Sequence, residues 1–199
     1  MNLFIIWYWK LVGNMRCIST FLEKIDHEMP KYNEININRQ AYKIDGNSGI
    51  KLHCQKGELK SVDYFDNHPV KGFLYLEFSD LIASDEQIAA KINEIEQSNL
   101  SRKLTKELRK NYTSSIQREL VQKIKDTLHL QQLMGEYIEN IPEFFQTLGK
   151  FVIVIAPIEQ GKRSDVSRCI DRWRSAILTS MPKGMFNEVI FITLDVFTA

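Results

Sequence analysis

Acidic side chains near the ends of two neighbouring expected strands are the strongest candidates for chemistry in this chain. The segment 59–66 contains Asp63 and ends on Asp66, and Glu77 lies in the segment 72–79, which is otherwise almost wholly apolar. A short turn between the two segments would place one of these aspartates beside Glu77. Two such carboxylates, Asp66 and Glu77, would bind a hard cation such as Mg²⁺, which commonly takes one or two protein carboxylates plus waters and phosphate oxygens. The expected chemistry is phosphodiester hydrolysis.

The same residues also have a purely structural interpretation. Glu77 can be a buried acid that pairs with a basic side chain, and Asp66 can be a turn former before Asn67-His68-Pro69. Burial of a carboxylate without a partner is costly. If Glu77 is buried, a metal ion or a basic side chain is therefore expected beside it.

The elements that would position these carboxylates form a meander. Apolar spacing predicts an amphipathic helix over 15–29, and alternation and turn residues predict strands over 35–44, 50–54, 59–66 and 72–79. The first two of these strands are expected to form a hairpin. The strand 72–79 is apolar on both faces apart from its one acid, which predicts a central position in the sheet.

The second half of the chain predicts helices followed by a βαβ unit. Ser84 to Gln87 has the form of a capping box and predicts a helix start, and helices are also expected over 101–128 and 131–148. A strand at 151–156, a helix capped by Ser164 and a last strand at 188–197 follow. The predicted class is α/β, with a mixed central sheet, an N-terminal antiparallel meander, a helical insertion and a C-terminal βαβ unit.

This order, with an Asp at one strand end and a Glu-x-x motif on the next strand, resembles the PD-(D/E)xK (restriction-endonuclease-like) nuclease superfamily. The resemblance covers about residues 15–97. It implies that Asp66 (or Asp63) corresponds to the family's Asp and that Glu77 corresponds to its Glu. It also implies Mg²⁺ as cofactor and DNA as substrate.

Two further positions of the motif follow from this resemblance. Glu23 or Glu28 would correspond to the acidic residue that some members place on the first helix. Ser79 stands where the family has a lysine that orients or activates the attacking water, and Lys91, one helix later, is a candidate replacement. A serine there equally fits a copy that keeps the fold and has lost hydrolysis.

Two basic clusters are candidates for binding nucleic acid. The first is Arg102, Lys103, Lys106, Arg109 and Lys110, and the second is Lys162, Arg163, Arg168 and Arg172. Positive charge near a helix N-terminus is unfavourable to the helix dipole, so helix stability does not explain the first cluster. Exposed amides at the start of the second helix would add to its attraction for phosphate. The alternative in both places is an ordinary solvated helix face.

Composition limits the remaining possibilities. With 26 Lys+Arg and 25 Asp+Glu, the net charge is +1, so recognition of an anionic partner has to come from local patches. Three cysteines without CxxC spacing suit a reducing cytoplasm. The length predicts a single domain over 15–199 with a helical segment at 101–148. Residues 1–14 are expected to be an N-terminal appendage and not a membrane span, because Lys10 interrupts their apolar run.

Two functions remain as hypotheses. The first is a nuclease-like domain that hydrolyses DNA with a divalent metal, or an inactive derivative of one. The second is a non-catalytic adaptor, inhibitor or nucleic-acid-binding protein of the same fold, which Ser79 favours. The partner is then DNA or another protein, no membrane partner is expected, and the stretch 101–148 is a candidate homodimer interface.

Overall fold

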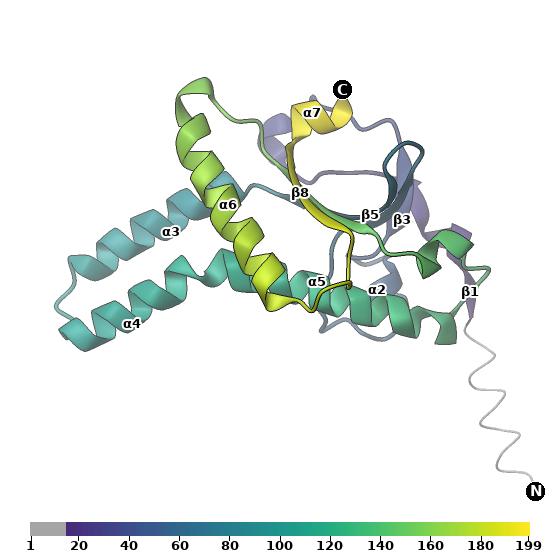
Figure 1. The fold of residues 1–199 in the computed structure, drawn as a ribbon, viewed down its shortest axis with the longest axis horizontal. Helices are drawn as coiled ribbons and strands as arrows, with labels where there is room; N and C mark the ends of the chain where they lie inside the picture. Colours follow the sequence, from purple (N-terminus) through teal and green to yellow (C-terminus); the bar gives the residue numbers. More distant parts are fainter. Residues whose placement is uncertain (1–14) are drawn as a thin grey trace, which may run out of the picture.

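The chain is built around a six-stranded mixed sheet, and a computed structural model describes its residues 15–199 (Figure 1). The strands lie in the order β2 (Leu22–Lys24), β3 (Gln40–Lys43), β4 (Tyr64–His68), β5 (Gly72–Ser79), β7 (Lys150–Ile155) and β8 (Glu188–Thr193). Neighbours from β2 to β5 are antiparallel, whereas β5, β7 and β8 are parallel. The predicted α/β class with a mixed sheet is confirmed.

Helices and short 3₁₀ turns connect these strands. The helices are α2 (Ile50–His53), α3 (Leu81–Glu96), α4 (Arg102–Thr113), α5 (Ser115–Leu133), α6 (Arg163–Ser180) and α7 (Leu194–Thr198). The 3₁₀ turns are η1 (Ile18–Phe21), η2 (Pro30–Tyr32), η3 (Met134–Glu136), η4 (Glu143–Gln146) and η5 (Gln160–Lys162). A separate parallel pair joins β1 (Arg16–Cys17) to β6 (Ile138–Glu139).

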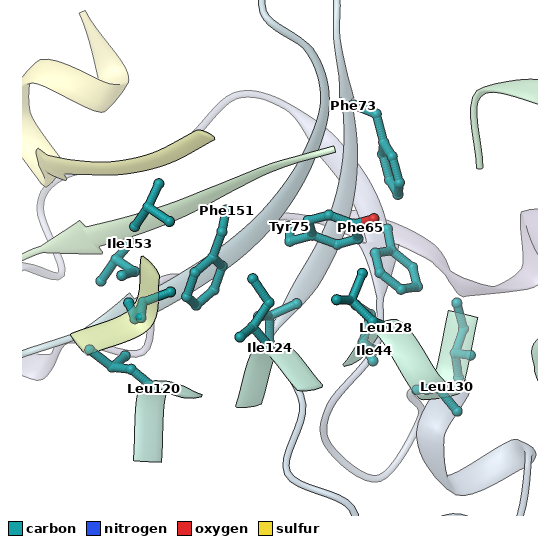
Figure 2. Packing of buried hydrophobic residues seen from close by; sticks show 14 of the residues in the cluster. Ile44, Phe65, Phe73, Tyr75, Leu120, Ile124, Leu128, Leu130, Phe151 and Ile153 are labelled. Atoms are coloured by element: carbon teal, nitrogen blue, oxygen red, sulfur yellow. The ribbon is translucent and has the colours of Figure 1, made fainter. Parts of the chain in front are cut away.

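Both faces of the sheet are buried. Helices α5 and α6 cover one face, where Tyr75 and Phe151 from the strands pack against Leu120 and Ile124 of α5 (Figure 2). The opposite face packs against α7 and the segment 25–37. Because side chains alternate between the two faces of a strand, the central strands β5 and β7 need apolar residues at nearly every position. This explains their continuous apolar sequences.

Helices α3 and α4 form a hairpin that extends away from the sheet (Figure 1). Asp80 caps α3 by accepting a hydrogen bond from the Ala83 amide, and Ser101 caps α4 by accepting one from the Leu104 amide. No residue of α4 is buried. The helix expected over 101–128 is therefore two helices, with the boundary at Ser114, whose ψ of 2° departs from helical values.

The helix predicted over 15–29 is wrong. Ile18 and Phe21 are buried as expected, but they belong to the single turn η1, and the chain then forms β2. Leu22 pairs with Tyr42 of β3. A short amphipathic segment gains little as an isolated helix, and the pairing with a neighbouring strand outweighs that gain.

The hairpin predicted between 35–44 and 50–54 is also wrong, because residues 50–53 form α2. The chain turns tightly before this helix. A Cβ on Gly49 would lie 2.2 Å from the carbonyl oxygen of Ile44, so only glycine fits there. As a result, β3 pairs with β2 and β4.

Three other predicted boundaries differ from the structure. Residues 131–148 are not a helix beyond Leu133 but contain η3, β6 and η4, consistent with the helix breakers Gly135 and Pro142 in this stretch. The strand expected over 188–197 ends at Thr193, where α7 follows. Helix α3 begins at Leu81 and not at Ser84.

No helix within residues 15–199 combines the length and apolar character that a membrane span requires. The appendage expected at residues 1–14 lies outside the described part of the chain.

Candidate functional site

Asp66 and Glu77 lie on opposite faces of the sheet, so the predicted shared metal site between them is wrong. In the β4–β5 ladder Asp66 pairs directly with Leu74, which belongs to the core on the α7 side. Glu77 is two residues after Tyr75 and points to the α5 side with it. The sheet itself therefore separates the two carboxylates.

Asp66 instead has a structural partner. Its Oδ2 accepts a hydrogen bond from the Arg39 guanidinium at 2.7 Å, and the carboxylate is only 2% exposed. Burial raises the pKa of Asp66 to about 6, although the charge of Arg39 opposes this rise. Asp66 is thus a buried, paired acid within β4, and its interpretation as a turn former is wrong.

The pH dependence of stability tests this account of Asp66. Because burial raises its pKa above the usual 3.8 in the folded state, the folded protein favours the protonated form of Asp66. The contribution of this group to the free energy of unfolding is therefore complete below about pH 4 and is lost as the pH rises through about 6. The loss amounts to about 3 kcal/mol. We expect Asp66→Asn to remove most of this change in urea denaturation between pH 4.5 and 7. An unchanged pH profile in the variant would contradict the assignment.

Asp63 is the carboxylate that the structure brings to Glu77. The register that pairs Tyr64 with Leu76 places Asp63 directly opposite Glu77, on the same face of the sheet. The Asp63 amide donates to the Leu76 carbonyl at 2.9 Å, and its Oδ2 accepts from the Phe78 amide at 2.7 Å. These two bonds fix Asp63 at the end of the ladder. Burial raises its pKa to about 6.

Lys123 of α5 completes this group, which we call the Asp63–Glu77–Lys123 site. Its ammonium donates to Glu77 Oε1 at 2.5 Å. Burial, and then the charge of Asp63, raise the pKa of Glu77 well above its usual range, and Lys123 opposes both. Burial lowers the pKa of Lys123, but the charges of Glu77 and Asp63 outweigh burial and raise it overall.

One oxygen of this site has no partner. Glu77 is 2% exposed, and its Oε2 is buried without a hydrogen bond to any described residue. Such an atom is costly to bury unless something occupies its lone pairs. With both acids ionised and Lys123 protonated, the three side chains carry a net charge of −1. The site is therefore suited to a further cation.

Glu77 and Lys123 also line a cavity of about 400 Å³, which we call the Glu77 cavity. It lies between the end of β5 and helices α3, α4 and α5, with Lys91 and Tyr112 among its lining residues. Asp63 flanks Glu77 without being one of these lining residues. The cavity is large enough to admit a small group beside Glu77 and Lys123.

The other residues expected at the site lie at different distances from it. Lys91 lines the Glu77 cavity but is exposed, and its ion pair is with Glu94 at 2.8 Å and not with Glu77. Ser79 lines the cavity as well. Glu23 and Glu28 both pair with Lys43, at 2.9 and 3.9 Å, away from the cavity. The helix expected to carry these two acids is not formed.

The two basic clusters differ in their surroundings. In the second cluster, Lys162 pairs with Glu86, Arg168 with Asp165 and Arg172 with Asp85. The start of α6 is capped by Lys162 without a side-chain hydrogen bond, so the cap predicted at Ser164 is wrong. In the first cluster, on α4, only Arg109 pairs with an acid among the described residues, namely Glu96. The charge of the first cluster therefore remains largely unneutralised.

Sequence reasoning missed Lys123, although a signal was present. Ile116, Leu120 and Ile124 form the buried stripe of α5. Lys123 lies three residues after Leu120 and borders this stripe, where an apolar residue is expected. A lysine at such a position indicates a buried acid opposite.

Within residues 15–199 no cluster of three or more His, Cys, Asp or Glu side chains is placed to hold a metal ion. Two carboxylates are nevertheless a common protein contribution to a Mg²⁺ site, where waters and phosphate supply the remaining ligands. Comparisons with protein-family models, with curated proteins and with solved structures gave no match.

Proposed function

We propose that this chain hydrolyses phosphodiester bonds of DNA with a divalent metal ion held by Asp63 and Glu77. The observation that carries the proposal is the buried, unpartnered Oε2 of Glu77, which lies in a site of net negative charge beside a cavity. A divalent cation is the ligand that best satisfies this oxygen. Asp63 thus takes the role of metal ligand that the sequence analysis gave first to Asp66.

The surrounding fold supports a restriction-endonuclease-like arrangement. Asp63 precedes β4, Glu77-Phe78-Ser79 ends the adjacent β5, and α3 follows. This is the order of Asp, Glu-x-x and helix that the resemblance to the PD-(D/E)xK superfamily implies. Two features depart from that pattern. The first helix is replaced by η1 and β2, and Ser79 stands in the position of the family's lysine.

Each residue has a distinct role in this proposal. Asp63 and Glu77 would hold Mg²⁺, which when bound acidifies a water and stabilises the charge that develops on the phosphate. The ammonium of Lys123, already in contact with Glu77, takes the place of the missing lysine and favours the ionised form of Glu77. Lys91, on the wall of the Glu77 cavity, is available to hold a phosphate oxygen.

Cleavage of labelled DNA tests the proposal. We expect the protein to cut a fluorescent oligonucleotide in Mg²⁺ or Mn²⁺ and not in EDTA, with Asp63→Asn at least about a hundredfold slower because a metal ligand contributes several kcal/mol. Asp66→Asn is the matched control, since Asp66 is a buried aspartate of the same strand region on the other face, and it should cleave at the wild-type rate. Equal losses in the two variants would contradict the assignment.

Ser79 favours a second candidate function, a non-catalytic adaptor or inhibitor with the same fold. In that case the protein binds its partner without any divalent-dependent cleavage. Absence of cleavage in Mg²⁺ and in Mn²⁺, from protein whose folding is verified, would support this alternative over hydrolysis.

A further inference from the structure

Helix α4 carries a continuous basic surface, which we call the α4 basic face. It consists of Arg102, Lys103, Lys106, Arg109 and Lys110, all of them exposed. At about 3.6 residues per turn these five side chains fall within about 120° of arc. The leucines of α4, at positions 104 and 108, lie on the other side of the helix. The cations therefore gather on one face of the hairpin.

The four acids of α3, the helix that packs beside α4, already form ion pairs. On α3, Asp85 and Glu86 pair with Arg172 and Lys162 across the chain. Glu94 pairs with Lys91 on its own helix. Glu96 reaches α4, where it pairs with Arg109 at 3.0 Å.

Four cations of the α4 basic face, at positions 102, 103, 106 and 110, thus have no acidic partner among the described residues. Only Glu107 opposes them on α4 itself. Cations gathered in this way are destabilising to one another. An anionic partner that lies along the helix would relieve this repulsion.

The α4 basic face borders the Glu77 cavity. Tyr112 lines this cavity, and it lies three residues after Arg109, so the two side chains are neighbours on the helix surface. A chain of phosphates that follows α4 towards its C-terminal end therefore arrives beside an aromatic ring at the cavity. Basic residues that lead to an aromatic side chain are typical of sites for single-stranded nucleic acid.

We propose that the α4 basic face binds the backbone of single-stranded DNA and leads it into the Glu77 cavity, where Tyr112 stacks on a base. What happens to the strand at Glu77 rests on the proposed function, whereas binding along α4 does not. A single strand is required because the carboxylate of Glu77 is 2% exposed and is reached through a cavity of about 400 Å³. One nucleotide enters such a space, but a duplex does not.

Fluorescence anisotropy with a labelled oligo(dT) in EDTA measures this binding without any cleavage. The test variant replaces four unpaired cations by glutamine (Arg102→Gln, Lys103→Gln, Lys106→Gln and Lys110→Gln). Its matched control removes four exposed lysines that form no ion pair among the described residues (Lys24→Gln, Lys60→Gln, Lys125→Gln and Lys183→Gln). Both variants lose the same net charge, so a difference between them reports the position of the charge.

We expect the test variant to bind at least about tenfold more weakly at low salt, with the slope of log K against log salt reduced by about 3. The control should bind nearly as the wild type does. A duplex that contains the same oligo(dT) strand should bind more weakly than the single strand. Equal affinities of test variant and control, or tighter binding of the duplex, would overturn the proposal, as would binding only to an acidic protein and not to DNA.

Tyr112 gives an independent readout. We expect Tyr112→Ala to weaken binding at least about fivefold and Tyr112→Phe to leave it unchanged, because stacking requires the ring and not the hydroxyl. Equal loss in both variants would contradict stacking. If the protein binds DNA in EDTA but does not cleave it in Mn²⁺, the binding inference stands and the proposed hydrolysis is rejected. If the test variant binds as the wild type does and still cleaves DNA, the proposed hydrolysis stands and the binding inference is rejected.

Discussion

Glu77→Gln is expected to lower the rate of DNA cleavage at least about a hundredfold while leaving the protein as stable as the wild type or more stable. The amide keeps the volume of the side chain and an oxygen that accepts from Lys123. It loses the negative charge that a divalent cation requires, and a metal ligand contributes several kcal/mol to such a reaction. Cleavage rates in Mg²⁺ and urea denaturation at pH 7 measure the two effects.

The stability of this variant separates a functional acid from a structural one. Burial and the neighbouring Asp63 raise the pKa of Glu77, so its ionised form is costly to fold. Removal of that charge should leave the free energy of unfolding unchanged or raise it by about 1 kcal/mol. A cleavage rate equal to that of the wild type would show that Glu77 has no part in the chemistry.

Lys123→Met is expected to lower the free energy of unfolding by about 3–5 kcal/mol at pH 7, because it leaves the buried Glu77 beside Asp63 without a counter-charge. The deficit should shrink as the pH falls, since protonated Glu77 needs no partner. Urea denaturation at several pH values measures this. Lys125→Met, an exposed site on the same helix, is the control and should change stability by less than about 0.5 kcal/mol.

A double variant gives the sharper test of this pair. Glu77→Gln combined with Lys123→Met removes both charges, so we expect it to recover most of the stability that Lys123→Met loses. If the double variant were as unstable as Lys123→Met alone, the loss would have to be attributed to packing of the lysine stem and not to the unpaired charge.

The long apolar strands and the amphipathic helices were predictable from sequence. The run of apolar residues in 72–79 and in 151–156 indicates strands covered on both faces, and β5 and β7 lie at the centre of the sheet with α5 and α6 on one side. The parallel β7-α6-β8 unit also follows from the order of the segments. Each of these elements carries its signal within its own sequence.

The short elements were not predictable for a physical reason. The segment 15–29 has helical spacing, yet Leu22 pairs with Tyr42, a partner that lies 20 residues away in sequence. The segment 50–54 alternates like a strand, but the tight turn at Gly49 starts α2 instead. Elements of three or four residues, such as η1, β2 and α2, are decided by long-range pairing and turn geometry, which the local sequence pattern does not contain.

The site was half predictable. Glu77 stands out as a lone acid in an apolar strand, and the structure buries it beside Lys123, one of the two kinds of partner expected for a buried Glu77. Its partner depends on register, because a turn of residues 69–71 sets Asp63, and not Asp66, opposite Glu77. A change of one residue in register exchanges the faces of every side chain, and sequence alone left the choice between the two aspartates open.

Binding of Mn²⁺ measured by titration calorimetry tests the central claim most directly, since it needs neither substrate nor turnover. We predict one site in the wild type that is lost in Asp63→Asn and in Glu77→Gln and retained in Asp66→Asn. Mn²⁺ binding that persists unchanged in Glu77→Gln, or that is absent from the wild type, would contradict a metal ion at the Asp63–Glu77–Lys123 site.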